Sequence, residues 1–91
     1  MAHSTSNQLV TANRLRDGVP VYYAGVDRWS PVIADALLVA EAEAESLLAA
    51  AAAGPVPHPV VAPYLVEAVR QDGSVNPLSL RERIRAFGPT V

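Results

Sequence analysis

The sequence has no cysteine and no lysine among its 91 residues. The lack of cysteine excludes disulfides, thiolate metal sites, iron–sulfur clusters and a cysteine nucleophile. The five glycines stand singly, so there is no glycine-rich loop of the kind that cradles phosphates. Only five residues are aromatic, and we expect the core to need them, which argues against a base-stacking surface.

Long uninterrupted apolar runs are also absent. The longest apolar region, residues 32–53, is broken by four acidic residues that a membrane span would not accept: Asp35, Glu41, Glu43 and Glu45. The first eight residues have neither the basic start nor the apolar core of a signal peptide. We therefore expect a cytoplasmic protein with no membrane segment. Residues 1–8 are predicted to form a disordered arm and residues 9–91 a single α+β domain.

The strongest local signal is an alanine-rich stretch that predicts a helix over residues 41–53. Alanine is the best helix former, and Gly54 followed by Pro55 ends the segment. Its acidic first turns suit the positive end of the helix dipole. One face carries a narrow apolar stripe, Ala44, Leu47, Leu48 and Ala51, which favours close packing on a small sheet.

Two Asp-Gly pairs predict the hairpins of that sheet, which we expect to be mostly antiparallel. Asp17-Gly18 separates two segments of strand-like composition, and Asp72-Gly73 separates residues 64–70 from residues 74–78. Pro20 cannot donate to a ladder, so its strand should be an edge strand or turn that position toward solvent. The proline-rich residues 54–63 are predicted to form an extended connector.

Residues 31–53 have two interpretations. A continuous apolar stripe allows one long helix, whereas the apolar run Leu37-Leu38-Val39 is typical of a buried strand. Ser30-Pro31 is a helix-start signal in either case. We favour a helical turn at residues 31–35, a short strand at 36–40 and then the main helix.

A second, short helix is predicted at about residues 80–87. Ser79 and Glu82 form a capping-box pattern, and Gly88-Pro89 ends the helix. Leu80, Ile84 and Phe87 share one face, which we expect to dock on the domain, so that Arg81 and Arg85 lie on the exposed side.

Candidates for catalysis or metal binding are few. His3 lies in the predicted arm and His58 between prolines of the connector, so neither has the fixed geometry that a general base needs. No pair of histidine or carboxylate residues combines ligand spacing with a rigid support. We therefore predict a protein that is not an enzyme and holds no metal or cofactor.

The remaining candidate is arginine, which supplies all seven basic residues of a chain with a net charge of −2. A biased codon usage also produces this pattern, and the helix arginines can be paired with Glu82 or Glu67. The functional interpretation is a docking patch for an acidic partner or an anion. Its predicted members are Arg14, Arg16, Arg81, Arg83 and Arg85.

Four segments together resemble a small bacterial family catalogued as a domain of unknown function. They are TANRLRDG at residues 11–18, Trp29 ahead of IADA at residues 33–36, PYL at residues 63–65 and LRERIRAFGPTV at residues 80–91. The family's members are typically encoded beside siroheme-dependent sulfite reductase and siroheme synthesis genes. Pro20 and the proline-rich connector differ from the family pattern.

The resemblance implies a non-catalytic accessory protein of assimilatory sulfite reduction, which binds sulfite reductase or its electron donor through the arginine patch. One alternative is a nucleic-acid-binding regulator that uses the same arginines, and the net charge of −2 argues against it. Another is an enzyme or a small sensor of a sulfur oxyanion or of siroheme carboxylates.

Overall fold

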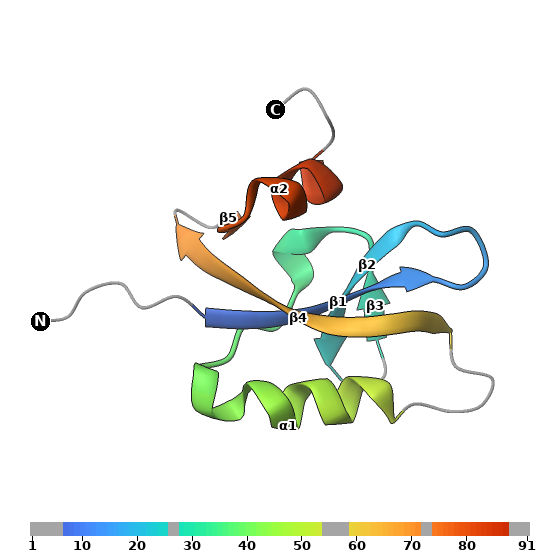
Figure 1. Cartoon of the computed structure of the whole chain (residues 1–91), viewed down its shortest axis with the longest axis horizontal. Helices are drawn as coiled ribbons and strands as arrows, with labels where there is room; N and C mark the ends of the chain where they lie inside the picture. Colours follow the sequence, from blue (N-terminus) through green and yellow to red (C-terminus); the bar gives the residue numbers. More distant parts are fainter. Residues whose placement is uncertain (1–6, 26–27, 54–58, 72–73, 88–91) are drawn as a thin grey trace, which may run out of the picture.

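A computed structural model describes residues 7–25, 28–53, 59–71 and 74–87. Within these residues the elements follow the order β1 (Asn7–Arg14), β2 (Pro20–Gly25), β3 (Arg28–Ser30), the 3-10 helix η1 (Ile33–Asp35), α1 (Glu41–Ala52), β4 (Val60–Gln71), β5 (Ser74–Pro77) and α2 (Leu80–Phe87). The strands form one antiparallel sheet in the order β3-β2-β1-β4-β5. α1 covers one face, and η1 and α2 lie over the other (Figure 1). The predicted α+β fold is confirmed.

The first Asp-Gly pair forms the predicted hairpin between β1 and β2. Gly18 has a φ of 75°, a conformation that glycine adopts without steric cost. The Arg14 amide donates to the Val19 carbonyl at 2.8 Å, and an Asp17 carboxylate oxygen accepts from the Val19 amide at 3.2 Å. β4 and β5 also pair antiparallel, but the predicted turn residues Asp72-Gly73 lie outside the described residues.

Of the two alternatives for Pro20, an edge strand or a position turned toward solvent, the first is wrong, because β2 lies between β3 and β1. Pro20 is the first residue of β2, and β3 pairs only farther along, from Tyr22 to Gly25. The missing amide therefore falls where β2 has a single neighbour, which a sheet tolerates.

Residues 31–53 are not one helix. The Ser30 hydroxyl accepts from the Val32 amide at 3.0 Å and leads the chain into η1. Val39 then exchanges two backbone hydrogen bonds with Gln8, of 2.8 and 2.9 Å, before α1 begins at Glu41. The favoured interpretation is confirmed in outline, but the predicted strand at 36–40 is only a single bridge.

β4 starts earlier than predicted, so the expected connector is wrong from residue 60 onward; residues 54–58 lie outside the described residues. Thr11 pairs with Tyr64 and Asn13 with Val61, which leaves Ala62 and Pro63 opposite one residue of β1. This bulge places a proline in a long strand without breaking it. Ala62 takes a positive φ of 53°.

The sheet has two packed faces because neighbouring residues of β1 point in opposite directions. Val10 packs with Tyr23, Leu65 and the α1 stripe, whose four predicted members, Ala44, Leu47, Leu48 and Ala51, are buried or half-buried as expected. Leu9, on the other face, belongs to a cluster that includes Ile33 and Val75. No helix within the described residues is long and apolar enough to cross a membrane.

Candidate functional site

The C-terminal helix α2 begins with half of the predicted capping box. The Glu82 amide donates to the Ser79 hydroxyl at 3.2 Å, which satisfies one of the free donors at the helix start. The predicted return contact from Glu82 to Ser79 is wrong. One Glu82 carboxylate oxygen accepts from the Tyr64 hydroxyl of β4 at 2.6 Å, and the other lies 3.4 Å from the Arg85 guanidinium.

Arg85 turns toward the sheet and is the principal attachment of α2. Its guanidinium donates to the Thr11 hydroxyl at 2.7 Å, to the Ala12 carbonyl at 3.1 Å and to the Asn13 side-chain oxygen at 2.6 Å. It also lies 5.5 Å from the centre of the Tyr64 ring, within the range of a cation–π contact. Only 16% of its side chain is exposed, so the expectation that Arg85 lies on the outer side is wrong.

The sheet surface under α2 explains this orientation. Thr11 is flanked in the sheet by Tyr22 on β2 and Tyr64 on β4, so three hydroxyl-bearing side chains form one row. Burial, and then the hydrogen bond to Glu82, raise the pKa of Tyr64. Burial likewise raises the pKa of Tyr22, and the neighbouring Thr11 hydroxyl partly offsets the rise, although the buried Tyr22 hydroxyl forms no hydrogen bond of ordinary geometry among the described residues. A polar row of this kind is matched by Glu82 and Arg85, whereas leucine or isoleucine would leave the Tyr64 hydroxyl without its acceptor; the Thr11 hydroxyl would keep only its own bond to the Val21 carbonyl.

The apolar stripe of α2 consequently faces outward, the reverse of the prediction. Leu80 is 64% exposed, Ile84 39% and Phe87 46%. Arg81 and Arg83 are exposed beside them: helical spacing places Arg81 next to Ile84, and Arg83 next to Leu80 and Phe87. We refer to these five residues as the α2 outward face. Neither Arg81 nor Arg83 forms an ion pair within the described part of the chain.

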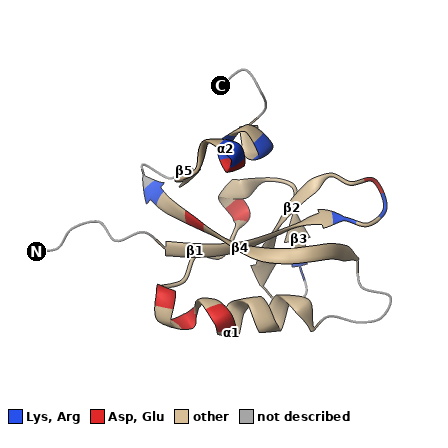
Figure 2. Ribbon diagram, in the orientation of Figure 1, with Lys and Arg blue, Asp and Glu red and all other residues tan. Residues whose placement is uncertain are grey.

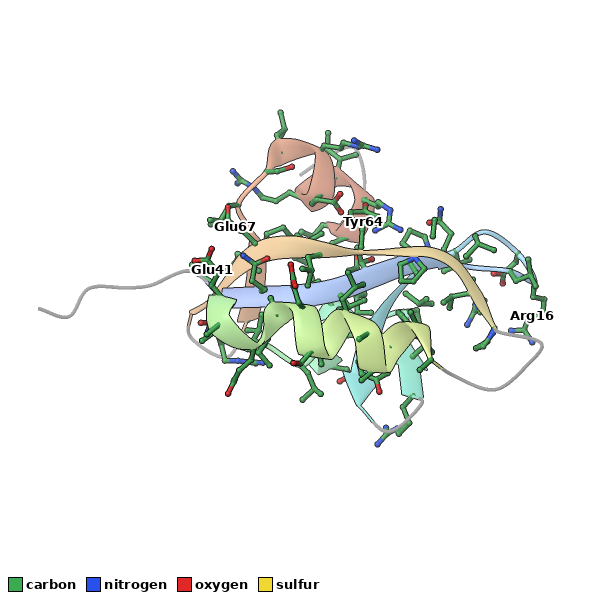
Figure 3. All side chains as sticks on the ribbon, turned by 60° about the horizontal axis from the view of Figure 1, so that its bottom comes forward. Arg16, Glu41, Tyr64 and Glu67 are labelled. Atoms are coloured by element: carbon green, nitrogen blue, oxygen red, sulfur yellow. The ribbon has the colours of Figure 1, made fainter. Side chains whose placement is uncertain are left out.

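The two arginines of the first hairpin are placed differently. Arg14 donates two 3.0 Å hydrogen bonds to Asp17, which hold the pKa of that carboxyl below its usual range. Arg16 is exposed at the tip of the β1–β2 loop, well separated from Tyr64 under α2 (Figure 3). The predicted set is therefore divided: Arg14 and Arg85 have internal acceptors, Arg81 and Arg83 share α2, and Arg16 stands apart.

The two helices differ in charge, although the exposed Asp35 of η1 lies on the same side of the sheet as α2. The acidic first half of α1 lies below the sheet and the arginines of α2 lie above it (Figure 2). The α2 outward face thus presents positive charge although the whole chain has a net charge of −2.

Two hollows formed by described residues adjoin α2. A pocket of about 410 Å³ lies between η1, β5 and the end of α2, and it is lined by residues 31–34, 74–76 and 86–87. A second hollow of about 330 Å³ includes Tyr64, Glu67, Ser79 and Glu82. Neither is lined by an arginine.

A known protein family matches nearly the whole chain, including α2 and the strands beneath it. Residues 8–91 match the family model described as protein of unknown function DUF2849. The chain belongs to the DUF2849 family. No curated protein and no solved structure matches this DUF2849 chain.

Sequence reasoning missed several residues of this DUF2849 domain. Tyr64, Thr11 and the buried side of Glu82 carry no sequence signal, because their importance depends on strand pairing. Within the described residues no group of three or more histidine and carboxylate side chains could hold a metal ion. His3 and His58 lie outside the described residues.

Proposed function

We propose that this DUF2849 domain is a non-catalytic protein-binding module that docks on an acidic partner through the α2 outward face. The observation that carries the proposal is the inverted orientation of α2. The helix turns its carboxylate, Glu82, toward the sheet and leaves two arginines and three large apolar side chains exposed.

This combination suits a protein interface better than solvent. Burial of an apolar side chain against a partner removes it from water, and stripes of exposed Leu, Ile and Phe mark interaction sites. Arg81 and Arg83 add electrostatic complementarity, which guides encounter with an acidic surface and sets orientation. Because Glu82 points toward the sheet, no carboxylate on α2 weakens the attraction of Arg81 and Arg83 to an acidic partner.

The family resemblance supports the choice of partner. The motifs resemble a family encoded beside siroheme-dependent sulfite reductase, so the proposed partner is that reductase or its electron donor in assimilatory sulfite reduction. Geometry does not support Arg14 and Arg85 as members of the docking patch, since Arg14 pairs with Asp17 on the surface of the β1–β2 loop and Arg85 is bonded to β1 beneath α2. The proposed contact residues are therefore Arg81 and Arg83, and Arg16, which lies away from α2 on the β1–β2 loop, is not among them.

The alternatives receive less support. A sensor of sulfur oxyanions or siroheme carboxylates would need arginines around a pocket, and the two described hollows have none. A nucleic-acid-binding domain uses a broad basic surface, whereas two of the predicted arginines have internal acceptors.

The experiment is a capture assay with purified sulfite reductase, and separately with its electron donor, at low ionic strength. The variant is Arg81→Glu/Arg83→Glu, which reverses the charge of the α2 outward face without removing a described contact. We expect the wild type to retain the partner and the variant to lose it, and added salt to weaken the wild-type complex.

The matched control is Arg16→Glu, because Arg16 is also exposed but lies on the β1–β2 loop away from α2, and this variant should retain the binding. Circular dichroism must show that all variants are folded. Equal recovery of wild type and the α2 variant would overturn the role of these arginines. Failure of the wild type to retain either protein would overturn the proposed partner.

A further inference from the structure

The pocket beside α2 continues the α2 outward face. Phe87 belongs to both, since it is the last member of the apolar stripe and lines the 410 Å³ pocket. Val32, on the opposite wall, is 53% exposed. Figure 1 shows η1, which follows Val32, directly beneath α2. No charged side chain lines the pocket, so it suits an apolar side chain rather than an ion.

An extended peptide is a poor occupant because the nearby sheet edge is closed. A strand that adds to a sheet needs free backbone groups on the edge strand. In β5 the pairing with β4 directs the backbone of Val75 and Pro77 outward, since Leu78 already donates to Glu67. Val75 is only 1% exposed and Pro77 has no amide, so neither offers an accessible donor. A helix, which satisfies its own backbone, fits this surface better.

A second copy of this chain is also a poor occupant. Pairing of two α2 helices by a twofold axis would bring Arg81 and Arg83 of both copies close together. α1 carries acidic residues, but its exposed positions are occupied by glutamate, alanine and serine, none of which supplies a large apolar side chain for the pocket.

We propose that the pocket between Phe87 and Val32 receives an apolar side chain from an amphipathic helix of the partner. That helix lies along the α2 outward face with acidic residues beside its apolar stripe, so that they face Arg81 and Arg83. This inference rests on the proposed function and specifies the partner's chemistry: acidic at the flanks, with a leucine-sized anchor in the pocket.

The test uses designed helical peptides as probes and the full chain as the receptor. The first peptide carries leucines at i, i+4 and i+7 with glutamates on both flanks. In the second the flanking glutamates are replaced by lysines, and in the third the leucines are replaced by alanines. Binding is measured by fluorescence anisotropy and located by amide chemical shifts. We expect only the first peptide to bind, with shifts at η1 and β5 as well as at α2.

Two variants isolate the pocket. Ala34→Phe fills it from an exposed position on η1, and Val32→Asp places a charge at its wall. Each should lower the affinity for the first peptide by about tenfold or more, which is the loss expected when a leucine of the peptide is no longer buried. Leu15→Asp is the matched control, because Leu15 is 59% exposed on the β1–β2 loop, and it should leave binding unchanged. Thermal unfolding checks that each variant folds.

The outcomes separate this inference from the proposed function. If the pocket variants bind the peptide like the wild type, or if shifts appear at α2 alone, the pocket is not the anchor site. Capture of the partner that still depends on Arg81 and Arg83 would leave the proposed function standing. Equal binding of the lysine-flanked peptide would contradict the acidic partner, and self-association of the free chain through α2 would replace it with a second copy.

Discussion

Replacement of Arg85 by methionine tests how α2 is held to the sheet. Arg85→Met keeps a long flexible side chain but removes the guanidinium. It eliminates the hydrogen bonds to Thr11, Ala12 and Asn13 of β1 and the pairing with Glu82. The Glu82 carboxylate, whose side chain is 9% exposed, keeps the Tyr64 hydroxyl as its side-chain donor.

The expected loss of stability in Arg85→Met follows from the burial of the Arg85–Glu82 pair. Removal of one partner of a buried ion pair costs about 3–5 kcal/mol, because the other charge stays buried without compensation. Arg85 retains 16% exposure, which admits some water, so we expect the lower end of that range, about 3 kcal/mol. A domain of this size has a total stability of about 5–14 kcal/mol. The unfolding midpoint should fall by about 12–24 °C.

Urea unfolding followed by circular dichroism and Trp29 fluorescence measures the loss. A double-mutant cycle with Glu82→Gln isolates the pair, because the amide carries no charge and still accepts from Tyr64. We expect Glu82→Gln to be less harmful in the Arg85→Met background than in the wild type, with a coupling of at least about 1 kcal/mol. A loss below about 1 kcal/mol for Arg85→Met, or strictly additive effects, would refute the conclusion that α2 is anchored by this pair.

Three further predictions concern the sheet. Tyr22→Phe should raise the free energy of unfolding by about 1 kcal/mol in urea unfolding, because it removes a buried hydroxyl without a partner; a loss would show that the hydroxyl is satisfied. Ala62→Gly should raise it by about 0.5 kcal/mol, since glycine adopts the positive φ of 53° freely, and a lower thermal midpoint would contradict this. The pKa of Asp17 is lower in the folded than in the unfolded chain, so its ionised form stabilises the fold. This contribution to the free energy of unfolding is complete above the unfolded pKa of about 3.9 and is lost as the pH falls through the lower folded pKa. Wild type and Asp17→Asn should therefore differ near neutral pH and converge in acid, and a constant difference would exclude the Arg14–Asp17 contact as its source.

The predicted α+β class and both helices depend on local signals, which explains their agreement with the structure. The alanine content predicts α1, which ends at Ala52, and Ser79 begins α2 where expected; the predicted Gly54-Pro55 exit lies outside the described residues. The side that α2 presents to the sheet is not a local property. Its apolar stripe predicts inward packing only if the surface beneath is apolar, and that surface became polar through the pairing of Tyr22, Thr11 and Tyr64.

The predicted arginines also differ in whether their contacts are local in the sequence. Arg14 and Asp17 lie three residues apart, so their ion pair was within reach of sequence reasoning. The acceptors of Arg85 on β1 lie more than 70 positions earlier in the chain, and no spacing rule relates them. The Ala62-Pro63 bulge is a similar case, because prolines at this density indicate a connector unless the partner strand is known.

The placement of β1 at the centre of the sheet has a consequence for synthesis on the ribosome. β1 precedes the other described strands in the chain, yet its second neighbour, β4, begins only at Val60, and the arginine that binds α2 to β1 is Arg85. The nascent hairpin must wait with one side of β1 unpaired until most of the chain has been translated. A domain with this topology is expected to complete its fold late. Until β4 is available, the unpaired side of β1 must be protected from pairing with other chains.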